Sequence, residues 1–107
     1  MADGQVGSMP VKIPKSVKIK DQVWKIKFVS KLQDDSGDDC LGLCDFSERV
    51  ILMLKGQSKS AEAQTFMHEI IHASFYELHV VIPEEIEEVL CDGLGYILTN
   101  SFSVCEK

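Results

Sequence analysis

The sequence predicts an α+β fold in which a small, mainly antiparallel sheet packs on two helices. Three observations support this fold class. Apolar residues alternate with polar ones in the first half of the chain, residues 61–78 have a helical pattern, and a second helical pattern follows Pro83. Apolar residues at every second position are typical of strands, whereas a spacing of three or four is typical of helices.

The chain of 107 residues is long enough for one domain with a single modest core. Residues 1–10 have no periodicity, so we expect a disordered tail or a remnant of cloning there, followed by one domain over residues 11–107. The N-terminus has no signal-peptide pattern and no apolar run reaches the about 20 residues of a membrane span. We therefore expect a cytoplasmic protein, without a membrane partner.

The net charge of −6 argues against nucleic acid as the main partner. Seven of the eleven Lys and Arg residues lie between Lys12 and Lys31, at alternating positions that indicate the solvated face of strands. The four cysteines match no common zinc pattern, and we interpret them as small buried apolar residues of a reducing compartment. They are Cys40, Cys44, Cys91 and Cys105.

Strands are predicted within residues 17–28 and 41–54. In the first range the alternating apolar residues are Val17, Ile19, Trp24, Ile26 and Phe28. A break at Asp21-Gln22 indicates a hairpin. The polar residues 33–40 include four aspartates, but their spacing does not fit a calcium loop, so we expect a solvated turn.

The first helix is expected from about residue 61 to about residue 78, with Ser58 or Ser60 as its N-cap and Glu62 in its first turn. The second begins near Pro83, and we interpret Glu84, Glu85 and Glu87 as its solvated start. An apolar stripe should pack this helix on the first helix and the sheet. The stripe consists of Ile86, Val89, Leu90, Leu94, Ile97 and Leu98.

The strongest functional signal is the sequence HEIIH, in which His68 and His72 lie four residues apart within the first predicted helix. Residues at this spacing share one helix face, with Cβ atoms about 5 to 6 Å apart, so both imidazoles can bind one zinc ion. Glu69 is about 100° round the helix, outside the metal's ligands but able to accept a proton from a metal-bound water. The alternative is that both histidines are ordinary helix residues bordering the core.

A zinc site needs a third protein ligand, with the fourth position left to water if the site is catalytic. Glu88 is the best candidate, because Asp92 lies one turn further on the same face and could orient a zinc-bound imidazole. His79 and the other glutamates of the second helix remain alternatives, although His79 is about 10 Å beyond His72 along an unbroken helix. Tyr76 or His79 could donate a hydrogen bond to an oxyanion.

The pattern of His68, Glu69 and His72, followed by Glu88 and Asp92, resembles the HExxH plus ExxxD pattern of zinc metallopeptidases whose third ligand is glutamate. Over roughly residues 17–100 the chain is similar to short zincin-like proteins of phages and their bacterial relatives. The resemblance implies a minimal zincin-like fold, one zinc ion bound by the two histidines and Glu88, Glu69 as general base, and Asp92 as a support for a ligand histidine.

The resemblance also implies a peptide or protein substrate, bound where the strand at residues 50–54 would form the edge of the cleft. A phage-encoded protein would act in the host cytoplasm. The gap from His72 to Glu88 is shorter than in large relatives such as thermolysin, so the cleft would be minimal. The rival hypothesis is a catalytically weak or inactive binding protein that docks to a protein partner; a third is a structural domain without metal.

Overall fold

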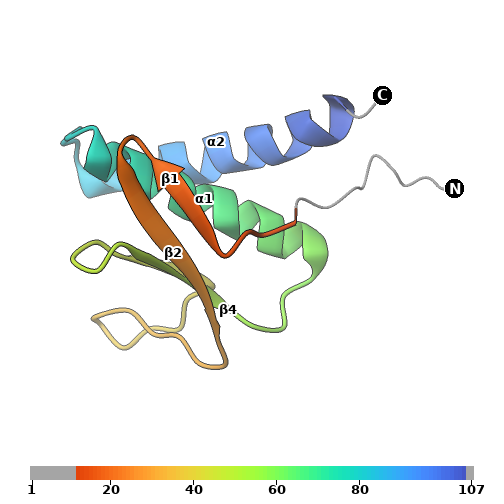
Figure 1. Cartoon of the computed structure of the whole chain (residues 1–107), viewed down its shortest axis with the longest axis horizontal. Helices are drawn as coiled ribbons and strands as arrows, with labels where there is room; N and C mark the ends of the chain where they lie inside the picture. Colours follow the sequence, from red (N-terminus) through yellow and green to blue (C-terminus); the bar gives the residue numbers. More distant parts are fainter. Residues whose placement is uncertain (1–11, 106–107) are drawn as a thin grey trace, which may run out of the picture.

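A computed structural model describes residues 12–105, and the predicted tail at residues 1–10 lies outside this range. The model confirms the α+β class, with one four-stranded sheet and two long helices (Figure 1). The strands are β1 (Ser16–Ile19), β2 (Gln22–Val29), β3 (Gly42–Asp45) and β4 (Val50–Leu54), and the helices are α1 (Lys59–Glu77) and α2 (Glu84–Cys105). Neither helix, over the described residues, is long and apolar enough to cross a membrane.

The sheet has the order β1-β2-β4-β3 and is mainly antiparallel. The β1–β2 and β3–β4 pairs are antiparallel, whereas β2 and β4 run parallel. The prediction that Val50–Leu54 forms an edge was therefore wrong, because β4 is bonded on both sides and β3 is the edge strand. The reason is that β4 is apolar throughout and none of its residues is exposed, as expected of an interior strand.

The predicted turns and caps are close to those observed. The β1–β2 hairpin turns at Lys20 and Asp21, with Lys20 at a φ of 58°. Residues 33–40 form a solvated turn in which an Asp34 carboxylate oxygen accepts from the backbone nitrogens of Ser36 and Asp38. Ser58 is the N-cap of α1, and its hydroxyl accepts a hydrogen bond of 3.2 Å from the backbone nitrogen of Ala61.

The core lies between the sheet and α1. Alternate residues of β2 and β4 meet the apolar face of α1, and this buried cluster comprises Trp24, Ile26, Ile51, Met53, Phe66 and Ala73. Phe28 continues the β2 pattern but is 36% exposed. The prediction that one face of β2 is buried is thus confirmed near the middle of the strand. The buried face of α1 packs against this core, and this contact fixes the position of the helix on the sheet.

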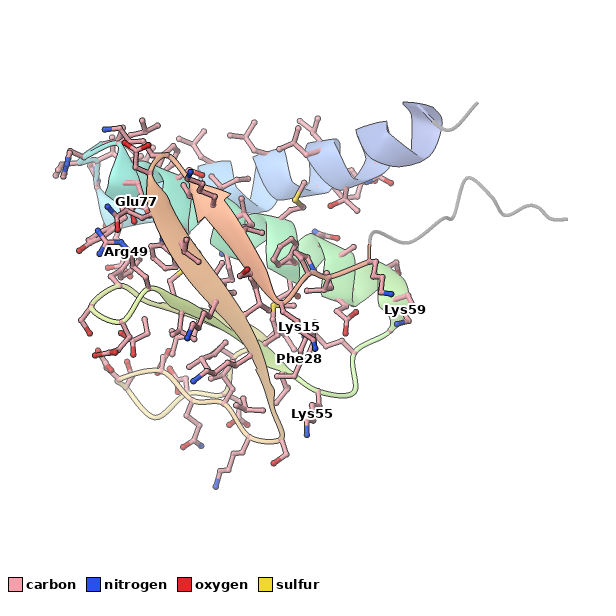
Figure 2. All side chains as sticks on the ribbon, viewed as in Figure 1. Lys15, Phe28, Arg49, Lys55, Lys59 and Glu77 are labelled. Atoms are coloured by element: carbon pink, nitrogen blue, oxygen red, sulfur yellow. The ribbon has the colours of Figure 1, made fainter. Side chains whose placement is uncertain are left out.

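A buried carboxylate fixes the C-terminal end of α1 to the sheet. Glu77 accepts from the indole nitrogen of Trp24 at 2.8 Å and from Nε of Arg49 at 2.6 Å. Figure 2 shows Arg49 and Glu77 together at one end of the molecule. The Arg49 hydrogen bond, helped by that from Trp24, lowers the pKa of Glu77 against the opposing effect of burial.

Helix α2 packs along α1 rather than on the sheet (Figure 1). Its Gly95 approaches α1 closely, since an added Cβ would lie 3.3 Å from the backbone nitrogen of His68. The predicted packing of the α2 stripe was wrong: Ile86 is 51% exposed, Val89 70% and Ile97 55%. The helix turns its carboxylates and small residues toward α1, and this leaves much of its apolar surface facing outward.

Candidate metal centre

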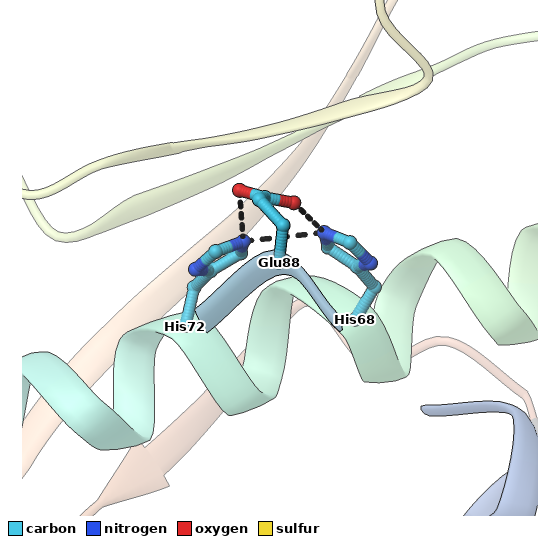
Figure 3. Close-up of side chains that lie close together, drawn as sticks. All are labelled: His68, His72 and Glu88. Atoms are coloured by element: carbon cyan, nitrogen blue, oxygen red, sulfur yellow. Dashed lines mark hydrogen bonds and ion pairs between the residues drawn. The ribbon is translucent and has the colours of Figure 1, made fainter. Parts of the chain in front are cut away.

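Three side chains from two helices converge on one point. His68 and His72 lie one turn apart on α1, with their Nε2 atoms separated by 3.2 Å. Glu88 approaches from α2: one carboxylate oxygen is 3.3 Å from Nε2 of His68, and the other is 3.1 Å from Nε2 of His72. Figure 3 shows the carboxylate facing both rings. The structure thus brings together the three ligands that the sequence analysis favoured.

The spacing of these atoms fits a tetrahedral zinc ion. Nitrogen and oxygen ligands about 2.0 to 2.1 Å from such an ion are about 3.3 to 3.4 Å from one another. The two Nε2 atoms are 3.2 Å apart, close to this value, and each lies 3.3 Å or 3.1 Å from a different oxygen of Glu88. One ion could therefore contact both rings together with the Glu88 carboxylate.

The opposite nitrogen of each ring is held by a carboxylate. Oδ1 of Asp92 lies 2.7 Å from Nδ1 of His68, and Oε2 of Glu87 lies 2.5 Å from Nδ1 of His72. An ionised carboxylate can only accept, so in a neutral imidazole the proton is on Nδ1 and the lone pair on Nε2. Two lone pairs and the Glu88 carboxylate then face one another, and a cation between them satisfies all three.

Asp92 is where the sequence analysis expected it, as the partner of a ligand histidine. Glu87 differs from the prediction of a solvated helix start. Its side chain is only 22% exposed and contacts the ring of His72. The signal was present, because Glu87 lies one turn before the fully buried Cys91 on the same helix face. Glu84 and Glu85 are exposed, in agreement with the prediction.

Glu69 lies beside this group but is not one of its three ligands. It is 6% exposed and lines the same cleft as the histidines. Burial raises its pKa, although the hydrogen bond from Cys44 and the nearby imidazoles oppose this. Glu69 is therefore a buried carboxyl group beside the candidate metal ligands, which is where a general base would have to lie.

Strand β3 shapes the surroundings of Glu69, which the sequence analysis did not foresee. The Cys44 thiol lies 3.3 Å from both Oε1 and the backbone oxygen of Glu69, so it is more than a small apolar residue. A Cβ at Gly42 would be 2.7 Å from Cγ2 of Thr65 and 3.1 Å from Oε2 of Glu69. Only glycine lets the strand approach so closely. Cys40, Cys44 and Cys91 are free thiols. The side chain of Cys105 is not among those that the structure describes.

The site opens into a cleft between the edge strand β3 and the two helices. Neither Tyr76 nor His79 is among the described residues that line it, so the predicted oxyanion donors are not at the site. Tyr76 packs against Trp24 and Phe46. His79 follows the end of α1 with a φ of 59°, and it is not part of the ligand group, so its role as third ligand is not supported.

A second group of possible ligands consists of His72, Glu87 and Cys91. It shares His72 with the first group, and Nδ1 of His72 already has Glu87 as its hydrogen-bond partner. Burial raises the pKa of the Cys91 thiol to about 12, so this thiol is protonated at neutral pH. The group with Glu88 offers the better set of donors.

Comparison with protein-family models, curated proteins and solved structures finds no match to this chain. The assignment of function therefore depends on the geometry of the metal centre and on the residues around it. These residues are His68, Glu69, His72, Glu87, Glu88 and Asp92.

Proposed function

We propose that this protein is a zinc-dependent metallopeptidase that binds one zinc ion through His68, His72 and Glu88. The observation that supports the proposal is the convergence of two imidazole nitrogens, 3.2 Å apart, with the Glu88 carboxylate, whose two oxygens lie 3.3 Å and 3.1 Å from Nε2 of His68 and of His72. Each imidazole is also oriented by its own carboxylate. Such support of ligand histidines is a common feature of protein zinc sites.

Zinc, when bound, supplies a Lewis acid that activates water and polarises the scissile carbonyl. Glu69 would take the proton of the attacking water and transfer it to the leaving amine. Cys44 donates to Oε1 of Glu69 and so keeps the carboxylate turned toward the cleft. Asp92 and Glu87 hold the two imidazoles with Nδ1 protonated.

We propose that a peptide or protein substrate binds in extended form along β3, the edge strand that lines the cleft. Gly42–Asp45 pairs with β4 on one side only, so its other side is available for a further strand. This replaces β4 as the peptide-binding strand. We also propose that the protein acts in the cytoplasm, because free Cys40, Cys44 and Cys91 suit a reducing compartment.

The test combines metal content with hydrolysis of a mixed peptide library. We expect near one zinc per chain in the parent protein and marked loss in His72→Ala and Glu88→Ala. Glu69→Gln should keep its zinc but lose hydrolysis by at least about a hundredfold, the usual contribution of a general base. Glu85→Gln, an exposed change on α2, serves as the control.

The possible outcomes separate the hypotheses. Zinc without hydrolysis in the parent protein would replace the peptidase with a metal-containing binding protein. Zinc loss in His72→Ala but not in Glu88→Ala would assign the third ligand to another residue. No zinc uptake by any sample would overturn the metal site itself.

A further inference from the structure

Helix α2 exposes an apolar face that the metal centre does not use. Val89 is 70% exposed, Tyr96 58%, Ile97 55% and Ile86 51%. At about 100° per residue these side chains and Leu90 lie within an arc of about 120°. The carboxylates that reach the histidines project toward α1. A group of adjacent exposed apolar side chains on a small protein is a common feature of interaction sites.

Gly93 lies in the middle of this face. Among residues 12–105, a Cβ added to it would have no atom within 4 Å, whereas one added to Gly95 would meet the backbone of His68. Glycine in a helix costs about 1 kcal/mol relative to alanine. Packing within the chain explains Gly95 but not Gly93. A small residue at the centre of an apolar helix face allows a second helix to approach closely.

We infer that the outer face of α2, comprising Ile86, Val89, Leu90, Gly93, Tyr96 and Ile97, is the interface of a two-fold symmetric dimer of this chain. The two α2 helices would run antiparallel and cross at Gly93. A two-fold axis through this crossing point places Val89 of one protomer opposite Ile97 of its partner, and Leu90 opposite Tyr96. The N-terminal half of the face on one protomer therefore contacts the C-terminal half on its partner. The surface is thus self-complementary, as a two-fold interface requires.

The distribution of charge along α2 supports this partner and this direction. All acidic residues of the helix lie in its first half, from Glu84 to Asp92, and residues 93–105 carry no charge. A parallel pair would place the two acidic halves side by side. In the antiparallel pair each acidic half lies beside an uncharged half. The two Glu85 residues are then about 24 Å apart along the axis, well beyond the Debye length of about 8 Å.

The inference does not depend on the proposed peptidase activity, although it affects the same helix. Glu87, Glu88 and Asp92 lie outside the arc of the dimer face and reach the histidines of α1. A partner helix would cover the outer side of α2 and would favour its docked position. Dimerisation would then stabilise the carboxylates that face His68 and His72.

Sedimentation of the full chain under reducing conditions, over about two decades of concentration, tests the inference. We expect the parent protein to form a dimer and nothing larger. Val89→Glu should raise the dissociation constant by about tenfold or more, because it puts a charge into an apolar interface. Val23→Glu, at a β2 residue that is 57% exposed, is the matched control and should dimerise as the parent does.

Gly93→Leu is a second test of the dimer interface, and it adds an apolar side chain where Val89→Glu adds a charge. It should preserve or increase helix content and thermal stability in the monomer, where its side chain has open space. It should nevertheless weaken the dimer, because the helices can no longer cross closely. Circular dichroism verifies that both interface variants are folded.

Three results would overturn the inference. One is a parent protein that is monomeric at all concentrations. Another is unaltered dimerisation in both Val89→Glu and Gly93→Leu. The third is dimerisation that begins only after residues 1–11 are removed, since the N-terminal segment would then be the occupant of the face.

Discussion

Gly95 of α2 lies against His68 of α1, so closely that an added Cβ would be 3.3 Å from the His68 backbone nitrogen. Asp92 and Glu88 lie about one and two helical turns before Gly95, and both reach the ring of His68. The distance between the two helices therefore determines the geometry of the proposed metal centre. It sets how far each carboxylate stands from its imidazole.

Gly95→Val should weaken zinc binding by about tenfold or more. The larger side chain must separate α2 from α1, which withdraws the proposed ligand Glu88 and the supporting Asp92 from the histidines. Loss of a supporting partner such as Asp92 alone costs about 10- to 100-fold in metal affinity. Competition with a chromophoric chelator measures the effect. Val23→Ala, at a β2 residue that is 57% exposed, is the control and should leave zinc affinity unchanged. Equal affinity in both variants would contradict the role of Gly95.

Glu87→Gln and Asp92→Asn should each reduce zinc affinity by about 10- to 100-fold without removing a ligand. Each variant replaces a charged acceptor at Nδ1 of one histidine by a neutral amide, which makes the imidazole a weaker donor to the metal. The same chelator competition applies. Glu85→Gln is exposed and should behave as the parent does. A loss confined to Asp92→Asn would show that Glu87 has no part in the site.

Removal of zinc should lower the stability of the parent protein. A ligand present at 100 times its dissociation constant stabilises the folded state by about 2.7 kcal/mol, which corresponds to a Tm change on the order of 10 °C for a domain of this size. Thermal unfolding with added zinc and with EDTA measures the difference. His72→Ala should unfold at the same temperature in both conditions. A parent Tm that is indifferent to EDTA would argue against a bound metal.

Gly42→Ala should impair hydrolysis more than zinc binding. Its Cβ would come within 2.7 Å of Thr65 and 3.1 Å of Glu69, so β3 or the Glu69 side chain has to move. The three ligands His68, His72 and Glu88 are untouched. We expect at least about a tenfold fall in kcat/KM at normal zinc content, since catalysis is sensitive to misplacement of about 1 Å. Val23→Ala, at a β2 residue that is 57% exposed and outside the described lining of the cleft, is the control.

Glu77→Gln should lower the free energy of unfolding at neutral pH and should make this free energy less dependent on pH in the acidic range. The pKa of Glu77 is lowered from its ordinary value of 4.5, chiefly by Arg49. A lowered pKa means that ionised Glu77 stabilises the fold above about pH 4.5, and that this contribution disappears as the pH falls through the folded-state pKa. Urea unfolding at pH 7 and at pH 3.5 tests the prediction. The midpoints of parent and Glu77→Gln should converge at the lower pH.

Glu48→Gln provides the reference for that experiment. Glu48 is exposed, and its side chain has no hydrogen bond or ion pair with the residues that the structure describes. Glu48→Gln should leave the urea midpoint of the parent protein unchanged both at pH 7 and at pH 3.5. If Glu77→Gln were as stable as this control at pH 7, the ion pair with Arg49 would contribute nothing to the fold.

The α+β class, the helix N-cap at Ser58 and the His68–Glu69–His72 motif were predictable from the sequence because each depends on local spacing. Residues four apart on a helix share a face whatever the rest of the chain does. The pairing of Asp92 with a histidine was predictable in part, since it lies one turn after Glu88. These features are set within single elements.

The order of the strands and the rotation of α2 on α1 were not predictable in this way. They depend on contacts between segments far apart in the chain, and local patterns do not encode which partner a strand or helix face will find. Those contacts put β4 inside the sheet, turned Glu87 toward His72, brought Gly42 and Cys44 against Glu69, and left Val89 and Ile97 exposed. The grouping of His68, His72 and Glu88 could be predicted from spacing, whereas the contacts of Glu87 and Cys44 and the outward face of α2 were decided only by packing.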